Sequence, residues 1–341
     1  MTIVCSAGHG LSMDNFTHSL AGWALGQTGL KTKSRKALAA LILGANLPDI
    51  DVFFGWVPWL PLATHRGFTH GLLGGIVIMP AMLAALLWLL DRWQCSRGEK
   101  FASGLPMNGA WLLLLSYLGA LTHPLLDLQT SYAVQLLSPF STRWFHTDTL
   151  FIIDAMLWTV LPLAIWLSRR RERLGLPWRR PAIAGLVVAC AYILLNGGIT
   201  LMARHALASE LGWTPQVIYA GEEPVLFWTR NLVWRQGDRV GQAQYDPLHS
   251  LTHVTDIQPM IPDGMRDPLV GRAIAAAPGL KPFLNWSTMP MAFVRRGQCE
   301  AQVELMDARF MPAIGDRSVA PRARPFGHPP VMLSIEGRGC P

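Results

Sequence analysis

The sequence predicts an α-helical polytopic membrane domain followed by an extramembrane C-terminal domain that is rich in β-strands. Three observations lead to this prediction. The 341-residue chain is 51% hydrophobic and only 15% charged, whereas a soluble domain carries about 25% charged residues. Basic side chains cluster beside long apolar runs in residues 1–203, and residues 204–341 hold short apolar runs separated by Pro and Gly. This composition is not that of an ordinary cytosolic enzyme.

Four runs with few or no charges are long enough to cross a hydrocarbon core of roughly 30 Å at about 1.5 Å per residue. They are residues 71–90, 110–128, 149–168 and 182–203. The apolar runs at residues 16–30 and 37–52 are shorter and contain glycine or acidic residues. We expect these two to be half-buried or packed against the other helices.

The basic residues predict the orientation of the chain. Of the 15 Lys and Arg before residue 204, 13 fall in the blocks 31–36, 92–100 and 169–180. The positive-inside rule places such blocks on the cytoplasmic side. Residues 204–341 then lie outside, in the periplasm if this is a bacterial inner membrane. The net charge of +7 therefore describes membrane topology, and no nucleic-acid partner is predicted.

We expect three parts: an N-terminal extension with little structure (1–12), the membrane domain (13–203) and the extramembrane domain (204–341). The first twelve residues lack the basic start and apolar core of a cleavable signal peptide. Cys5, Cys95 and Cys190 are expected to be free thiols, whereas Cys299 and Cys340 could form a disulfide in the outer domain.

Most ionisable residues of the membrane domain outside its basic blocks gather in five short motifs at the ends of apolar segments. The predicted topology places the last four motifs on the outer face, and the first joins them if residues 16–30 run inward. A single converging site explains this arrangement. The motifs are Phe16-Thr17-His18-Ser19, Leu47-Pro48-Asp49-Ile50-Asp51, His65-Arg66-Gly67-Phe68-Thr69-His70, His123-Pro124-Leu125-Leu126-Asp127 and His146-Thr147-Asp148.

Imidazoles and carboxylates without thiolates are ligands for Zn²⁺ first, and also for Mn²⁺ or Fe²⁺. His123 and Asp127 are four residues apart and share one face of a helix. The set exceeds the needs of one closed site, so it is compatible with two ions, which would activate a water and hold the reacting oxygens. The candidate ligands are His18, Asp49, Asp51, His65, His70, His123, Asp127, His146 and Asp148.

Each motif alone also has a structural explanation. Asp49 could cap a helix, and Asp127 could pair with Arg143. Asp154 is equally compatible with supporting a ligand, with a hydrogen-bond link and with no role in a site. Arg66 and Arg143 are the basic residues outside the three blocks. They could hold a phosphate and stabilise charge in a transition state, as catalytic groups, or pair with acidic residues to hold the site together. Burial of the whole set near lipid without compensation would cost several kcal/mol for each group.

At these residues the sequence resembles the YdjM-like family of inner-membrane metal-dependent hydrolases, which is also described as LexA-binding. The resemblance covers residues 13–150 through Asn15-Phe16-Thr17-His18 and the next three motifs in order. The family is distantly similar to zinc-dependent phospholipase C and the P1-type nucleases. The resemblance therefore implies phosphoester hydrolysis with clustered zinc ions. The implied ligands are His18, Asp49, His65, His70, His123 and Asp127.

Two features depart from the family. Its motif often continues with Ser after the second histidine, whereas this chain has Gly71. LexA binding would need a cytoplasmic surface, but the predicted topology places both the metal site and the C-terminal domain outside. That partner is therefore not carried over to this chain.

In the C-terminal part, short apolar runs at 216–219, 225–228, 231–234, 301–305 and 331–335 predict strands, with a turn at 236–238. Trp228, Trp234 and Trp286 are expected in the core or at an interface. His249 and His253 are four residues apart, but acidic residues nearby are sparse, so we do not predict a metal site there.

The leading hypothesis is a membrane-bound metallohydrolase that acts on a phosphoester or lipid-linked ester, with the lipid bilayer as its surroundings and a lipid or lipid-linked substrate. The alternative is a non-catalytic membrane protein that uses the same ligands for structural metal binding or metal transport. Transport would need polar residues through the bilayer midplane, and Asp154 is the only such residue in the sequence. This favours the enzyme.

Overall fold

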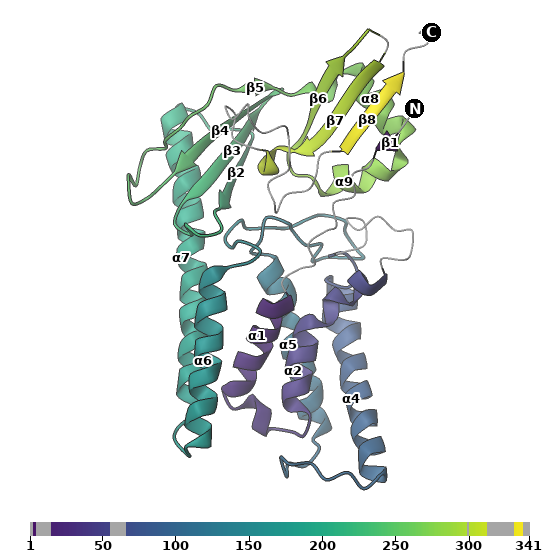
Figure 1. Ribbon diagram of the computed structural model, residues 1–341, viewed down its shortest axis with the longest axis vertical. Coiled ribbons are helices and arrows are strands. Elements are labelled where there is room, and N and C mark those ends of the chain that lie inside the picture. The colour runs from purple at the N-terminus through teal and green to yellow at the C-terminus, as the bar shows by residue number, and fades with distance from the viewer. Residues whose placement is uncertain (1–2, 5–14, 55–65, 299, 312–330, 337–341) are drawn as a thin grey trace. The chain divides into compact units, whose positions relative to one another are not determined.

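The computed structural model describes residues 3–4, 15–54, 66–298, 300–311 and 331–336 (Figure 1). The chain divides into two compact units. One comprises residues 12–197, and the other comprises residues 198–341 together with residues 1–11. The division falls inside one long helix, so we describe each unit by itself and call them the membrane unit and the C-terminal unit.

The membrane unit consists of helices. The long α-helices are α4 (Met79–Ser96), α5 (Gly109–Asp127), α6 (Ala155–Arg173) and α7 (Arg179–Leu211), and shorter ones precede them. These are α1 (Asn15–Gln27), the 3₁₀ turn η1 (Leu30–Thr32), α2 (Ala37–Asn46), the 3₁₀ helix η2 (Leu47–Phe54) and the π-helix η3 (Leu72–Ile78), which runs directly into α4.

Three helical segments of the described chain are long and apolar enough to cross a membrane: Leu72–Ser96, Gly109–Asp127 and Arg179–Leu211. They contain the predicted spans 71–90, 110–128 and 182–203 almost entirely. The predicted span 149–168 is not among these three segments, and its bounds differ from those of helix α6. Its helix begins only at Ala155, because the Asp154 carboxylate accepts hydrogen bonds from the backbone N–H groups of Met156 and Leu157, both at 3.0 Å, and so caps α6.

Helices α1, α2 and α5 pack with their backbones nearly in contact. A methyl group on Gly22 would lie 2.6 Å from the carbonyl oxygen of Leu41, and one on Gly119 would lie 2.5 Å from that same oxygen. A methyl group on Gly44 would lie 2.8 Å from the Ser116 carbonyl oxygen. Small residues allow this close approach of helices in membranes. It fixes the spacing of the three helices that carry or precede most of the candidate ligands.

The loops with the predicted basic blocks meet at one end of these helices. Lys31 pairs with Glu172 at 2.5 Å and lies over the ring of Trp178. Arg35 pairs with Asp91, near the end of α4, at 2.8 Å. The five His and Asp motifs belong to the opposite ends of α1, α2 and α5 or to the loops that follow them. The chain thus separates its three basic blocks from its candidate ligands.

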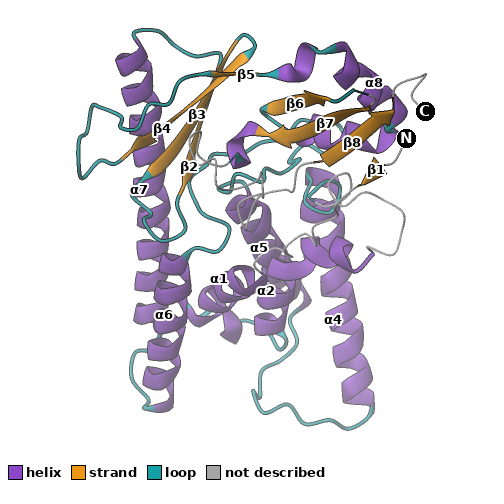
Figure 2. Cartoon of the chain, turned by 45° about the horizontal axis from the view of Figure 1, so that its top comes forward, coloured by secondary structure: helices purple, strands orange, loops and turns teal. Residues whose placement is uncertain are grey.

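The C-terminal unit contains two antiparallel four-stranded sheets (orange in Figure 2). The first has the order β2 (Val217–Glu222), β3 (Arg230–Gln236), β4 (Arg239–Tyr245) and β5 (Ile261–Pro262). The second has the order β1 (Ile3–Val4), β8 (Val331–Glu336), β7 (Glu300–Asp307) and β6 (Pro290–Arg296). Short helices connect them: η4 (Gly264–Arg266), α8 (Pro268–Ala276), η5 (Pro278–Leu280), α9 (Lys281–Trp286) and η6 (Ala308–Phe310). The prediction of a β-rich part is confirmed.

Most predicted strands lie where the sequence placed them. Residues 231–234, 301–305 and 331–335 fall in β3, β7 and β8, and β2 covers 217–219. The predicted turn joins β3 to β4, with Gly237 at φ 61°. The predicted strand 225–228 is wrong, because the β2–β3 ladder ends at the pair Glu222–Arg230 and leaves these residues in a loop. Strand β4 was missed because Gly241 and two glutamines interrupt its apolar pattern; the Trp234 ring fills the space that a side chain at Gly241 would need.

Other predictions in this unit have mixed outcomes. Trp234 and Trp286 are buried as expected, and Trp228 packs partly buried against the core of the first sheet. The sequence predicted little structure in residues 1–12, whereas Ile3–Val4 pair with β8.

The cysteine predictions are only partly covered by the described chain. Cys95 and Cys190 are free thiols as expected. Cys5, Cys299 and Cys340 lie outside the described residues.

Candidate metal centre

Four buried side chains of the membrane unit direct ring nitrogens and carboxylate oxygens at one another. They are Asp49 in η2, His70 just before η3, and His123 and Asp127 in α5, each at most 2% exposed. The Nε2 atoms of the two histidines lie 3.1 Å apart. Asp49 Oδ1 lies 3.2 and 3.3 Å from them, and Asp127 Oδ2 lies 3.4 and 3.3 Å from them. We call these four residues the inner cluster.

Hydrogen bonds on the far side of each ring fix which nitrogen carries the proton. His123 Nδ1 lies 2.6 Å from the carbonyl oxygen of Ala45, near the end of α2, so Nδ1 must donate. The Thr69 hydroxyl donates to Asp51 Oδ2 at 2.6 Å and therefore accepts from His70 Nδ1 at 2.9 Å. In their neutral forms both histidines consequently present the lone pair of Nε2 to the cluster.

The inner cluster thus gathers four electron-rich atoms in a volume away from water. Protons on both Nε2 atoms would compensate the two carboxylates, and so would a divalent cation, which these atom types bind. Tetrahedral ligands at the usual zinc distances of about 2.0–2.1 Å are separated from one another by about 3.3–3.4 Å. The separations of Asp49 Oδ1 and of Asp127 Oδ2 from the two Nε2 atoms, and that between the two Nε2 atoms, run from 3.1 to 3.4 Å and are close to that value. Asp49, His70 and His123 form one group with ligand spacing and fit three ligand positions of a zinc ion.

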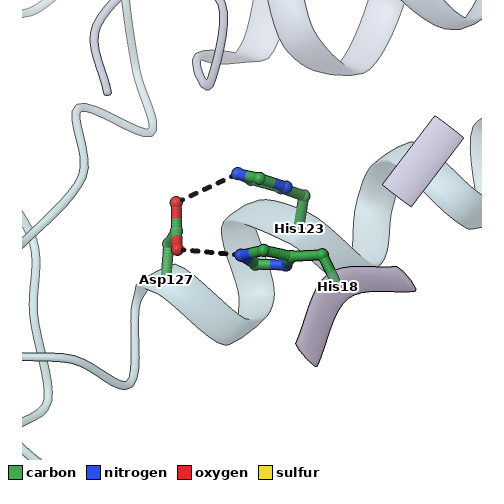
Figure 3. A group of neighbouring side chains, drawn as sticks. All are labelled: His18, His123 and Asp127. Atoms are coloured by element: carbon green, nitrogen blue, oxygen red, sulfur yellow. Dashed lines mark ion pairs between the residues drawn. The ribbon is translucent and has the colours of Figure 1, made fainter. Parts of the chain in front are cut away.

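His18 extends the cluster on the other side of Asp127. Its ring stacks on that of His123 with 3.7 Å between centroids, and its Nε2 lies 3.5 Å from Asp127 Oδ1. Figure 3 shows the two oxygens of Asp127 directed at the two histidines, one at each. His18, His123 and Asp127 make up a second group with ligand spacing. A cavity of about 20 Å³ beside His18 and Asp127 has room for about one water.

Arg66 is buried against the same carboxylate. Its Nη1 donates to Thr130 Oγ1 and to the carbonyl oxygen of Ala133, both at 3.1 Å. Its Nη2 lies 3.5 Å from Asp127 Oδ1. Of the two roles that the sequence left open for Arg66, this geometry matches the pairing that holds the site together, although with Asp127 as the partner.

The cluster environment sets the charge of its members. Burial alone would raise the pKa of Asp49, but where the Nε2 atoms of His123 and His70 are protonated their hydrogen bonds outweigh burial and hold that pKa well below its usual range. Burial lowers the pKa of His18, and the neighbouring His123 lowers it further, against the opposite effect of Asp127. Asp49 is therefore ionised and His18 neutral, which are the forms that bind metal.

Asp51 and His65 have different positions in relation to the inner cluster. Asp51 Oδ2 lies 3.8 Å from His70 Nδ1, so it is on the side of the ring that faces away from the cluster. There it holds Thr69, and through Thr69 it orients His70. His65 lies outside the described residues.

The structure does not bring the remaining candidates into the cluster. His146 Nδ1 pairs with Asp148 Oδ1 at 2.7 Å, and neither belongs to the groups with ligand spacing in the described chain. Arg143 is exposed, and its guanidinium lies 5.2 Å from the centre of the Phe145 ring. Asp154 is a hydrogen-bond link: besides capping α6, it accepts a bond from the Tyr192 hydroxyl at 2.8 Å.

Sequence reasoning gave no role to two groups that orient the histidines. Thr69 lies within the motif at residues 65–70, directly before His70. Its position next to a candidate ligand could have indicated this role. The Ala45 carbonyl leaves no trace in the sequence, because any residue would supply it. Gly71 also has a reason in the structure: a side chain there would lie 2.6 Å from the Ser138 carbonyl oxygen.

Comparison with known proteins covers this same part of the chain. The family model of the YdjM inner membrane protein matches residues 13–203. The chain belongs to the YdjM inner membrane protein family. The matched YdjM region contains all members of the inner cluster as well as His18 and Arg66, and it ends before β2. The resemblance at the motifs is thus confirmed at the level of the family.

The chain is also similar to the uncharacterized protein YfhP of Bacillus subtilis strain 168. The two are 25% identical over 167 residues, which are 45% of this chain and 46% of YfhP. The chain thus spans about half the length of this curated relative. No solved structure matches the chain. The distant similarity to phospholipase C and the P1-type nucleases therefore stays a prediction.

Proposed function

We propose that this protein is a membrane-bound, metal-dependent hydrolase that acts on a phosphoester or a lipid-linked ester. The observation that carries the proposal is the inner cluster, in which the Nε2 atoms of two histidines and two carboxylates converge at 3.1–3.4 Å inside a membrane-protein family. Zinc is the first choice of metal because the separations suit a tetrahedral site. Asp49, His70, His123 and Asp127 would hold it.

The neighbouring residues would serve the reaction. A bound divalent ion supplies Lewis-acid chemistry and a water that ionises near neutral pH. His18 is neutral and borders the small cavity next to Asp127, so it can accept a proton from a water there. Arg66 offsets the negative charge of Asp127 at Oδ1, the oxygen that also faces His18. Thr69 and Asp51 keep His70 turned toward the cluster.

A non-catalytic metal site is the second candidate, and one observation favours it. Structural zinc sites are closed by four protein ligands, whereas catalytic sites keep an open position. The inner cluster offers four ligands, each at most 2% exposed. Catalysis at this site would therefore require that one carboxylate leave its ligand position, or that His18 and Asp127 hold a second ion.

The deciding experiment measures metal content and hydrolysis on the full-length protein purified in detergent. We expect about one or two divalent ions per chain in the wild type and a loss of metal in His70→Ala. His146→Ala is the matched control, because His146 pairs with Asp148 outside the cluster. A panel of phosphodiesters and phospholipids then tests turnover. Absence of metal contradicts the whole proposal, and metal without metal-dependent turnover favours the structural site.

We also propose that the C-terminal unit lies on the periplasmic side. The contacts of Lys31 with Glu172 and of Arg35 with Asp91 support a common location of the three basic blocks, and such blocks stay in the cytoplasm. A reporter fused after residue 341 tests this topology. Cytoplasmic activity of the reporter would contradict it.

A further inference from the structure

The loop between β2 and β3, residues 223–229, exposes apolar side chains of the C-terminal unit. Val225 is 77% exposed and Leu226 is 47% exposed. The rings of Phe227 and Trp228 follow directly and meet edge to face at 5.1 Å. This run has the composition of a strand, but it stays outside the sheet. A contiguous exposed apolar segment of this kind marks an interaction site.

A buried arginine links this loop by hydrogen bonds to one position along α7. Arg230, at the start of β3, is only 1% exposed. Its Nη1 donates to the carbonyl oxygens of Phe227 and Thr229 at 2.6 and 2.8 Å, while its Nε donates to Thr200 Oγ1 at 2.9 Å. All these groups belong to the C-terminal unit. The loop therefore lies beside Thr200 of α7.

The sequence of α7 places Thr200 where the helix leaves the hydrocarbon core. After Arg179 and Arg180 the next charged residue is Arg204, and a span needs about 20 residues. The exposed apolar side chains of α7 also end there, with Leu201 and Met202. Of the described residues between Met202 and Trp213, none is an exposed large apolar side chain.

We infer that the β2–β3 loop inserts into the lipid interface next to α7, with Val225 and Leu226 at the boundary of the acyl chains. The partner is lipid because the exposed loop lies level with the end of the lipid-facing surface of α7 and continues it. Phe and Trp beside that level suit the interfacial zone, where aromatic rings are enriched. The C-terminal unit is thus held to the bilayer by a second contact besides α7.

A second exposed apolar loop supplies a matched control. Leu248 and Leu251, in the connection from β4 to β5, are 76% and 60% exposed. In the same connection His253 Nδ1 pairs with Glu210 at 2.8 Å. Glu210 is ten residues beyond Thr200, or about 15 Å further along the helix. Through His253 this connection is held at a position of α7 further from the bilayer, although Asp246 and His249 of the connection line one pocket together with Val225 and Leu226.

Spin labels on the full-length chain in liposomes test the inference. Single-cysteine variants Val225→Cys, Leu248→Cys and Leu194→Cys are made in a background in which the five native cysteines are Ser. Power saturation compares collisions with oxygen, which concentrates in lipid, and with a water-soluble nickel chelate. Leu194, an exposed apolar residue within the span, defines the lipid value.

We expect the label at residue 225 to favour oxygen, as at residue 194, and the label at residue 248 to favour the nickel chelate. Equal nickel accessibility at residues 225 and 248 would overturn the inference. Equal lipid exposure at the two positions would overturn it as well, because the level of the loop along α7 would then have no effect.

Discussion

Two regions of this protein bury carboxylates in different ways. In the C-terminal unit, Asp307 accepts hydrogen bonds from the Ser287 hydroxyl at 2.5 Å and from the backbone N–H of Arg309 at 2.9 Å. The Arg309 guanidinium adds two more at 3.0 Å. In the inner cluster, Asp49 and Asp127 face the two Nε2 atoms instead. In the neutral form of each ring the proton is on Nδ1, on the far side of the ring.

The comparison shows which buried charges indicate a ligand. Asp307 and Arg309 compensate one another within the chain, so their burial is explained by the fold alone. The inner cluster places two carboxylates against the Nε2 atoms of two histidines, an arrangement that needs either protons on those nitrogens or an added cation. Burial of a carboxylate is therefore a weak sign of function, whereas convergence of lone pairs whose protons are fixed elsewhere is a strong one.

Metal removal should produce the largest difference between the two regions. Structural zinc sites contribute on the order of 10 kcal/mol of binding free energy. We expect a chelator to increase hydrogen–deuterium exchange of α1, α2 and α5 and to leave β6 and β7 unchanged, with recovery on adding Zn²⁺. Unchanged exchange in α5 after verified loss of metal would contradict the comparison.

Loss of a partner in the self-compensated pair should have the next largest effect. Asp307→Ala leaves the Arg309 charge buried without its carboxylate, which costs about 3–5 kcal/mol. We expect reduced protection of β6 and β7 against exchange, with unchanged metal content. Asp267→Ala is the control, because it removes an exposed pair with Arg296 and a helix cap worth about 1 kcal/mol. An equal loss of protection in both variants would show that the buried charge of Arg309 does not require Asp307.

Thr69→Val should weaken the inner cluster without removing a ligand. The change deletes the hydroxyl between His70 Nδ1 and Asp51 at nearly constant volume. Groups that orient metal-bound histidines contribute about 10–100-fold in affinity, and we expect a loss in that range in a competition titration with a chelating dye. Thr122→Val is the control, since among the described residues the Thr122 hydroxyl bonds to the Gly119 carbonyl within α5. Equal metal affinities of the two variants would show that Thr69 does not contribute to metal binding.

In the C-terminal unit the smallest expected effect comes from acid, which weakens the pair of Asp307 and Arg309. Burial raises the pKa of Asp307, but Arg309 outweighs burial and holds that pKa below its usual value. The stability from the pair is therefore full above the unfolded pKa of about 3.9 and is lost as the pH falls further through the folded pKa. Unfolding of the full chain at pH 5, 4 and 3 checks this. Asp307→Asn should lack that part of the pH dependence, and parallel curves would contradict the assignment.

The sequence predicted part of the site for a physical reason. Ionisable residues are costly in an apolar helical domain, so His18, Asp49, His70, His123 and Asp127 stood out at the ends of apolar runs, and the structure brings them together. It could not separate them from His146, Asp148 and Arg143, because spacing does not reveal that His146 and Asp148 satisfy each other. It also could not show which side of the His70 ring Asp51 faces.

The same limit applies to the fold. Residues 149–154 are mostly apolar like the helix after them, and only the cap by Asp154 decides where α6 begins. Residues 225–228 have the pattern of a buried strand, yet they form an exposed loop. An apolar run predicts removal from water, and in a membrane protein both a sheet core and a lipid surface provide that.

The hydrogen bond from His123 to Ala45 has a consequence for biogenesis. The inner cluster is distributed from residue 49 to residue 127, and His123 acquires its tautomer only when the end of α2 has docked on α5. A ribosome-bound chain shorter than 127 residues cannot assemble these ligands. The proposed metal can therefore bind only after α5 is in place, so an inserted metal-free form would precede the metal-bound protein.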